Sequence, residues 1–413
     1  MVSLTNKTIV LGVTGGIAAY KTPDVVRALV TAGARVRVIL TQSAEHFVTA
    51  LALQTVSGQP VARGLFDLTE ESEIGHIRLA DEADALVITP ATANVIAKLA
   101  HGLADDLLST VALATRAPLL VCPSMNVHMY EHPTVRANLA HLRAAGHAIL
   151  EPDAGFLACG YSGAGRLPDA AAIVEEVRAI VGPKDLASLR VVVSAGPTWE
   201  ALDPVRHIAN RSSGKMGYAL ARLARRRGAD VTLISGPTSL EPLRGVRTVP
   251  VVSAREMEQA VLSEAATADV VIMAAAVGDF RPADSSRHKI KRGRADLELR
   301  LVPNPDILAR LGALTGPRLL VGFAAETRDL VANARRKLQA KGVHLMIAND
   351  VTAEGAGFDV DTNIVTILDR GGRVERLTKM SKEDVAAAIL DRVVDLHRVR
   401  ESSGAKRHEP RRR

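Results

Sequence analysis

The feature of this sequence that most constrains its fold is a repeated alternation of aliphatic strands, tight turns and helices with one apolar face. Residues 7–13 read as a short strand that runs into the turn Gly12-Val13-Thr14-Gly15-Gly16. A helical pattern follows, and Gly33 ends it before the next strand at 35–40. Such alternation predicts βαβ units and a parallel sheet with right-handed crossovers.

The alternation runs through the chain twice. It stops near Val181, and a second cycle begins at Arg190. In the first cycle, further strands are expected at 85–89 and 119–122, and helices opened by Ser43 and Ala93. In the second cycle, strands are expected at 191–194, 231–234, 270–274, 319–322 and 344–347, and helices at 216–227, 254–266 and 329–341. We therefore expect an α/β protein with two consecutive Rossmann-like parallel-sheet domains, residues 1–182 and 190–400, joined by a linker at 183–189.

Length and composition agree with this organisation. A chain of 413 residues is too long for one ordinary hydrophobic core. Aromatic residues make up only 3% of it, so the cores must consist of Ala, Val, Leu and Ile. Aliphatic cores of this kind are typical of parallel sheets that helices cover on both faces.

The net charge of +7 is concentrated at the C-terminus. Between Ser402 and Arg413 there are five cationic residues and one acidic residue, which leaves +3 for the rest of the chain. That excess suits phosphorylated small molecules as well as it suits RNA. No nucleic-acid partner is expected. Residues 401–413 contain no large apolar residue and are expected to form a disordered basic tail.

Two cysteines, Cys122 and Cys159, do not form a disulfide framework and favour a reducing compartment. Cys122 lies in an apolar strand and is interpreted as structural. No apolar run approaches the roughly 20 residues of a membrane helix. A cytoplasmic protein without a membrane partner is expected.

Polar and glycine-rich segments follow the strands of the first domain, where open parallel sheets bind their ligands. Gly15, Gly16 and Ile17 open a helix whose free N–H groups can bind a phosphate, although such turns also serve packing alone. The turn is neither G-x-G-x-x-G nor a P-loop. Thr41 and Ser43 follow the second strand, either as hydroxyl donors to the same phosphate or with Ser43 as a helix N-cap.

Three more segments complete the set. Pro90-Ala91-Thr92-Ala93-Asn94 combines small residues that let a flat ring approach. Pro123-Ser124-Met125-Asn126-Val127-His128-Met129 follows another strand. Leu157-Ala158-Cys159-Gly160 and Gly163-Ala164-Gly165-Arg166 form a glycine-rich flap around a thiol.

With Gly75-His76-Ile77, these segments resemble the flavin-containing cysteine decarboxylases over about residues 5–180, and within them the phosphopantothenoylcysteine decarboxylases. The resemblance implies a flavodoxin-like domain in which FMN oxidises the substrate thiol, so that the neighbouring carboxylate leaves as CO2. It implies an FMN site formed by Gly15, Gly16, Ile17, Thr41, Ser43, Thr92, Ala93, Asn94, Ser124 and Met125.

The resemblance also implies three catalytic residues. His76 is the base near the flavin, Asn126 holds the substrate carboxylate, and Cys159 is the proton donor that completes reduction of the enethiol. Taken singly, His76 reads as a surface residue and Cys159 as a small core residue. Two positions depart from the family pattern, because Tyr161 stands where Asp is expected and Leu167 where Met is expected.

In the second domain, Asn210 to Gly217 precede a helix, and Ser212 and Ser213 can bind an anion at its start. Gly214-Lys215 mimics the end of a P-loop, but Ala209 stands where that motif requires glycine. Taken singly, Lys289-Ile290-Lys291-Arg292 reads as a solvated basic loop, and Lys337 with Lys341 as an exposed helix face.

As a set, these residues resemble the phosphopantothenate–cysteine ligases over about residues 189–397. The resemblance implies that CTP activates the carboxylate of 4′-phosphopantothenate as an acyl-cytidylate, which the amine of cysteine then attacks. It assigns Asn210 to substrate binding and Lys289 to activation, with Mg2+ on the triphosphate near Asp279. The implied CTP site comprises Ala275, Asp279, Lys289, Pro305, Asp306, Ile307, Leu308, Phe323, Lys337 and Lys341. The identity of the base does not follow from the residues.

Two alternatives remain at this stage. A flavin-binding regulatory subunit would not need His76, Asn126 and Cys159 together, and a peptide-cysteine decarboxylase would not need the second domain. The resemblance implies a homo-oligomer, a dodecamer of flavin-domain trimers and ligase-domain dimers.

Overall fold

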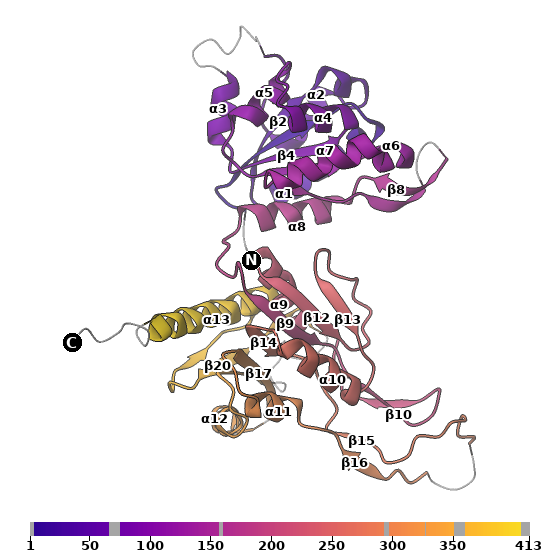
Figure 1. Cartoon of the computed structure of the whole chain (residues 1–413), viewed down its shortest axis with the longest axis vertical. Coiled ribbons are helices and arrows are strands. Elements are labelled where there is room, and N and C mark those ends of the chain that lie inside the picture. Colours follow the sequence, from indigo (N-terminus) through magenta and orange to yellow (C-terminus); the bar gives the residue numbers. More distant parts are fainter. Residues whose placement is uncertain are drawn as a thin grey trace, which may run out of the picture. The chain divides into compact units, whose positions relative to one another are not determined.

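A computed structural model describes residues 4–65, 75–156, 160–292, 297–326, 328–350 and 360–405. The chain divides into two compact units, residues 2–182 and residues from 183 onward, which are treated separately below (Figure 1). Among the described residues, no helix is both long and apolar enough to span a membrane.

The first unit is built on a six-stranded parallel sheet of order β3-β2-β1-β4-β5-β6. Without the short edge strand β3, the order is that of flavodoxin-like folds, and the order reverses between β1 and β4. The strands are β1 (Thr8–Val13), β2 (Arg35–Leu40), β3 (Val61–Ala62), β4 (Ala85–Ala91), β5 (Leu119–Pro123) and β6 (Ala148–Ile149), and the hairpin β7 (Asp153–Phe156) and β8 (Ser162–Arg166) lies outside the sheet.

Helices cover both faces of this sheet. One buried aliphatic cluster contains Leu11, Val25 and Leu29, and another contains Val10, Ile96 and Leu139 on the opposite side. The helical segments are η1 (Ile17–Lys21), α1 (Thr22–Thr31), η2 (Gln42–His46), α2 (Ala50–Ser57), α3 (Gly75–Glu82), α4 (Ala93–His101), α5 (Leu107–Ala114), α6 (Val127–Glu131), α7 (Pro133–Ala144) and α8 (Ala170–Val181).

The second unit has an eight-stranded sheet of order β13-β12-β9-β14-β17-β18-β20-β21. Six strands are parallel as expected, but β20 and β21 are antiparallel, so the sheet is mixed. The sheet strands are β9 (Arg190–Ala195), β12 (Asp230–Ser235), β13 (Arg247–Pro250), β14 (Val270–Met273), β17 (Leu319–Glu326), β18 (Leu345–Asp350), β20 (Val365–Asp369) and β21 (Val374–Arg376).

Figure 1 shows that short strands outside this sheet extend away from it as an arm. The arm contains the hairpin of β10 (Trp199–Ala201) and β11 (His207–Ala209) and the hairpin of β15 (Phe280–Pro282) and β16 (Leu301–Pro303). A further small pair is β19 (Thr362–Asn363) with β22 (Met380–Ser381). The helices are α9 (Lys215–Arg226), α10 (Ala254–Ala265), α11 (Ile307–Ala313), α12 (Leu330–Ala340) and α13 (Lys382–Ala405).

Three local expectations are wrong. Ser43 neither caps nor opens an α-helix, since η2 is a single 3-10 turn and α2 starts at Ala50, where Thr49 accepts from the N–H of Ala52. The expected linker 183–189 packs on the second unit, because its apolar residue Leu186 is fully buried.

The third concerns the C-terminal tail. Helix α13 continues to Ala405, beyond the expected start of a disordered tail at 401. A helix extends beyond its last buried residue because each added residue also adds a hydrogen bond. Residues 406–413 lie outside the described part.

His344, at the amino end of β18, makes the second unit sensitive to acid. Its Nδ1 accepts from the N–H of Leu320 at 3.1 Å. Burial, together with the charges of Arg370 and Arg400, lowers the pKa of His344 to about 4. Between pH 6.5 and 4, His344 is therefore protonated in the unfolded chain and neutral in the folded chain. The free energy of unfolding falls as pH falls through this window.

We expect this group to cost the second unit about 3 kcal/mol between pH 7 and pH 4. Calorimetry of the full chain at several pH values measures this loss on the thermal transition of the second unit. His344→Gln should weaken the pH dependence of that transition, and the exposed His288→Gln should leave it unchanged. Equal pH slopes in all three proteins would contradict the assignment.

Candidate active sites

The first candidate site lies at the carboxyl ends of β1, β2, β4 and β5. At the end of β1, Thr14 is buried and its hydroxyl donates to the carbonyl of Pro90 at 2.6 Å and accepts from the N–H of Thr92 at 3.1 Å. These bonds join the ends of β1 and β4. The order of the strands reverses between them, and such a point is where open α/β sheets bind ligands.

Gly15 follows Thr14 in a crowded place. A Cβ at this position would lie 2.3 Å from the Cβ of Ser43, so the segment after β2 closes tightly on the β1 turn. Only glycine fits between them without a shift of the backbone. Gly15 and Ser43 are thus brought together, as a shared phosphate site requires.

Thr41 has a different role from the one expected. Its hydroxyl donates to the carbonyl of Val13 at 3.1 Å, so this proton is not available to a phosphate. Thr92 is the N-cap of α4 and accepts from the N–H of Val95 at 3.4 Å. Ala93 and Asn94 therefore lie in the first turn of α4, where N–H groups are free of partners within the helix.

Asn126 begins α6 as its N-cap, because its Oδ1 accepts from the N–H of His128 at 2.8 Å. The side-chain amide also carries N–H groups, which are the kind of donor that a carboxylate accepts from. At the other end of α6, the Tyr130 hydroxyl donates to Glu151, and burial followed by this carboxylate raises the pKa of Tyr130 to about 12. Glu151 lies just before β7, so this bond joins α6 to the base of the flap.

The flap hairpin β7–β8 docks on α6 and on the segment before it. The Gly165 carbonyl accepts from the N–H of Met125 at 3.1 Å and from the hydroxyl of Ser124 at 3.2 Å. The Tyr161 ring meets the His128 ring edge-on, with centroids 5.0 Å apart. Cys159, the expected proton donor, lies outside the described residues. Leu167 is buried in the core.

His76 lies half-buried in the first turn of α3. Within the described part of the chain, no hydrogen bond joins it to the residues at the ends of β1, β4 and β5. The expected FMN site and the expected base are therefore placed on separate elements, and their distance in the loaded protein stays a prediction.

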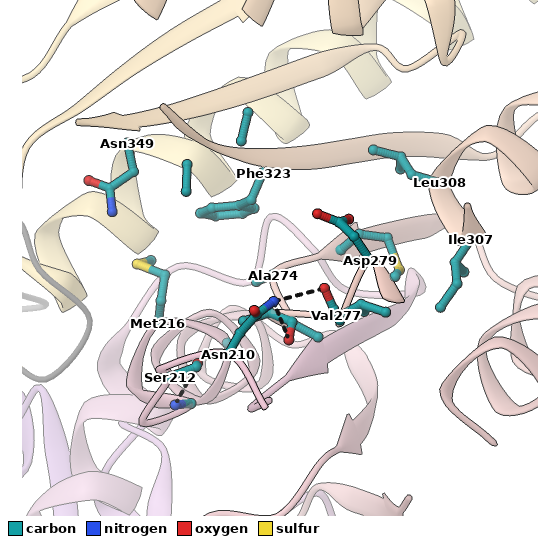
Figure 2. A pocket seen from close by; sticks show the side chains of 18 of the residues that line it. Asn210, Ser212, Met216, Ala274, Val277, Asp279, Ile307, Leu308, Phe323 and Asn349 are labelled. Atoms are coloured by element: carbon teal, nitrogen blue, oxygen red, sulfur yellow. Dashed lines mark hydrogen bonds between the residues drawn. The ribbon is translucent and has the colours of Figure 1, made fainter. Parts of the chain in front are cut away.

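The second candidate site is a cavity of about 750 Å³ at the carboxyl ends of β9, β14 and β17. Figure 2 shows Asn210 on one side of it and Phe323 and Asn349 on the other. Ten of the eleven residues expected for CTP and substrate line it, from segments far apart in the sequence. They are Asn210, Ala275, Asp279, Pro305, Asp306, Ile307, Leu308, Phe323, Lys337 and Lys341.

The floor of the cavity is the loop 275–278, which is held from several directions. The buried Ser194 and Thr198 accept from the N–H groups of Ala275 at 3.1 Å and Gly278 at 2.9 Å. The amide of Asn210 donates to the carbonyls of the loop, at 3.4 Å to Ala276 and 3.0 Å to Val277 (Figure 2). Asn210 thus contributes both to the floor and to the lining.

Helix α9 points its N-terminus at this cavity. A Cβ on Gly217 would lie 2.5 Å from the Cβ of Ala195, so α9 can approach β9 only with glycine here. The segment before α9 that the sequence singled out contributes Ser212, Ser213 and Lys215 to the lining. Three polar lining residues were not expected, and they are Asn349, Asn363 and Lys382.

These additions change the electrostatics of the cavity. Five cationic side chains line it against two acidic ones, which favours a polyanion. Asn363 is 4% exposed, and its Oδ1 has no hydrogen-bond partner among the described residues.

Lys337 and Lys341 line the cavity and are ion-paired. Lys337 lies 2.7 Å from Glu326, and Lys341 lies 3.3 Å from Asp306. Asp306 also caps α11, since it accepts from the N–H of Ala309 at 3.0 Å. The interpretation of the two lysines as a merely exposed helix face is therefore wrong.

Lys289 is the one expected residue that does not line the cavity. It is exposed, on the segment between β15 and β16. The described residues contain no cluster of three or more His, Cys, Asp or Glu side chains that could hold a metal alone. Asp279 would therefore supply one carboxylate ligand to the expected Mg2+, and phosphates would supply others.

Two family models match the chain. The Flavoprotein model matches residues 2–182, and the model of the DNA/pantothenate metabolism flavoprotein C-terminal domain matches residues 186–396. The "Coenzyme A biosynthesis bifunctional protein CoaBC" of Bacillus subtilis (strain 168) is 48% identical over 397 residues, which are 95% of this chain and 98% of that protein. The chain belongs to this family.

The Escherichia coli (strain K12) protein of the same name is 46% identical over 398 residues, 95% of this chain and 98% of its own length. A crystal structure of the C-terminal domain of a protein with this name is 40% identical, with a TM-score of 0.46, and covers 52% of this chain and 98% of its own. The expectation of a bifunctional enzyme of coenzyme A biosynthesis, with a flavoprotein domain followed by a ligase domain, is confirmed.

Proposed function

We propose that the second unit joins 4′-phosphopantothenate to cysteine at the expense of CTP, and that the first unit then decarboxylates the product to 4′-phosphopantetheine with FMN. The observation that carries the ligase half is the cavity lined by ten of the eleven expected residues. The flavoprotein match over residues 2–182 supports the decarboxylase half.

In the ligase cavity, the N-terminus of α9 and the five cationic side chains favour the phosphates of CTP. Phe323 offers a ring on which the base can stack. Asn210 binds the acyl group, and Lys289 offsets the negative charge that grows on the α-phosphate as the carboxylate attacks. Pyrophosphate leaves, and the amine of cysteine then displaces CMP.

Mg2+ bound to the triphosphate would neutralise part of its charge, with Asp279 as the protein ligand. The role of Asp279 is compatible with its place in the lining of the cavity (Figure 2).

In the decarboxylase site, bound FMN supplies the two-electron oxidation of the thiol. Gly15 lets the segment at Ser43 close on the turn after β1, and the first turn of α4 offers N–H donors to a cofactor at the ends of β1 and β4. Asn126 orients the substrate carboxylate without neutralising it, His76 takes a proton, and Cys159 returns one after CO2 has left.

We also propose that the protein is a cytoplasmic homo-oligomer. Apolar side chains on the arm support a dimer through the second unit, since large exposed apolar residues gather at interfaces. Val205 is 60% exposed, Phe280 54% and Leu301 43%. Trimers of the first unit, and hence a dodecamer, rest on family resemblance.

The test is to incubate the full chain with 4′-phosphopantothenate, cysteine, CTP and Mg2+ and to follow products by mass spectrometry. We expect 4′-phosphopantetheine, CMP and CO2. Accumulation of 4′-phosphopantothenoylcysteine would support the ligase alone and point to the altered flap at Tyr161. A yellow, FMN-loaded protein that forms no product would contradict both activities and favour a regulatory flavoprotein.

A further inference from the structure

Asp203, in the turn between β10 and β11, is an almost fully buried carboxylate, 3% exposed. Its Oδ1 accepts from the N–H groups of Val205 at 2.8 Å and Arg206 at 2.9 Å. Its Oδ2 accepts from the Arg206 guanidinium, at 3.0 Å from Nε and 2.7 Å from Nη2. Burial alone would raise the pKa of Asp203, but these bonds lower it far below its ordinary value, so the carboxylate stays ionised.

The same carboxylate reaches the segment that carries Lys289. The N–H of Ile290 donates to its Oδ2 at 3.1 Å, and the Arg206 guanidinium donates to the carbonyl of Ile290. On the other side of Lys289, the N–H of Ser286 donates to the carbonyl of Leu202 at 2.9 Å. The turn around Lys289 is therefore attached to the β10–β11 turn on both sides.

We propose that Asp203 is a positioning residue for ligation. It fixes the main chain at Lys289, so that the Cα of this lysine has a defined position from which the ammonium group reaches the nucleotide phosphate. This inference rests on the proposed role of Lys289. A lysine side chain has considerable rotamer freedom. A fixed main chain at this residue limits the volume that the ammonium group can occupy. Small displacements of a catalytic group cost a large part of its effect.

Asp203→Asn is the test, because it keeps the shape and removes one acceptor. In either orientation of the new amide, an NH2 group would face main-chain or guanidinium donors of the two segments. We expect pyrophosphate release from CTP and 4′-phosphopantothenate to slow about 10- to 100-fold, with the KM for CTP changed less than about twofold. Decarboxylation of added 4′-phosphopantothenoylcysteine by the same chain should not change.

A double-mutant cycle separates positioning from a merely structural role. If Asp203 acts through Lys289, D203N should slow the K289Q protein by less than about twofold. The matched control is Asp284→Asn, an exposed aspartate of the same segment, which should leave the rate of pyrophosphate release unchanged.

The outcomes are distinguishable. A full D203N effect in the K289Q background, or no effect of D203N alone, would overturn the inference and leave the proposed ligase function intact. Normal pyrophosphate release by K289Q would overturn the role of Lys289 and the inference with it. The thermal transition that CTP shifts reports folding of the second unit. If D203N lacks this transition, Asp203→Glu replaces it as the test variant. We then expect a smaller loss in the rate of pyrophosphate release, which again nearly disappears in the K289Q background.

Discussion

Asn126→Asp is expected to lower decarboxylation about 10²- to 10³-fold while α6 keeps its structure. Aspartate caps a helix as well as asparagine does, so the bond that Asn126 accepts from the N–H of His128 is preserved. The side-chain amide, however, becomes a carboxylate that repels the carboxylate of the substrate. Folding and function are thereby separated at one position.

CO2 release from 4′-phosphopantothenoylcysteine measures this effect, and absorbance measures the FMN content. FMN content and ligation should equal those of the unmodified chain. Asn6→Asp, the same exchange at an exposed turn of the first unit, is the matched control and should decarboxylate normally. More than half of the normal rate in N126D would show that Asn126 does not bind the leaving carboxylate.

Asn210→Asp is expected to lower ligation by a similar factor, about 10²- to 10³-fold. The Asn210 amide now donates to the Val277 carbonyl at 3.0 Å and to the Ala276 carbonyl at 3.4 Å. A carboxylate in its place would face these oxygens and the anionic substrates in the same cavity. The floor of the cavity would lose a support and gain a repulsive charge.

Formation of 4′-phosphopantothenoylcysteine is the measurement, with decarboxylation of the added intermediate as the internal control. Asn210→Ala removes the donor without adding a charge and should lose less activity than N210D. Equal losses in the two variants would contradict the electrostatic argument and leave only the lost hydrogen bonds. Together with N126D, this variant should show two activities that fail independently.

Most of the fold follows from local patterns in the sequence. The strand at 35–40 is β2 as expected, and the helix expected at 254–266 is α10 (Ala254–Ala265). Buried parallel strands are continuous aliphatic runs, and the helices between them have one apolar face, so both are visible without tertiary information.

The β20–β21 hairpin was missed although its turn, Gly371-Gly372, follows a strand-like run. A short polar strand such as Val374–Arg376 gains its stability from pairing with a neighbour. The 3-10 turn at Gln42–His46 was missed because α2 begins only at Ala50, where Thr49 is the N-cap.

The sequence by itself determined the two α/β units and the residue types after each strand, because the carboxyl ends of parallel strands meet at one edge of a sheet. Only the tertiary structure decided which of these residues share a cavity. It placed Lys382 and Asn363 in the same cavity as Asn210, and it placed Lys289 outside, on a turn held by Asp203. Distances between segments depend on packing and on long-range hydrogen bonds, and no local pattern encodes them.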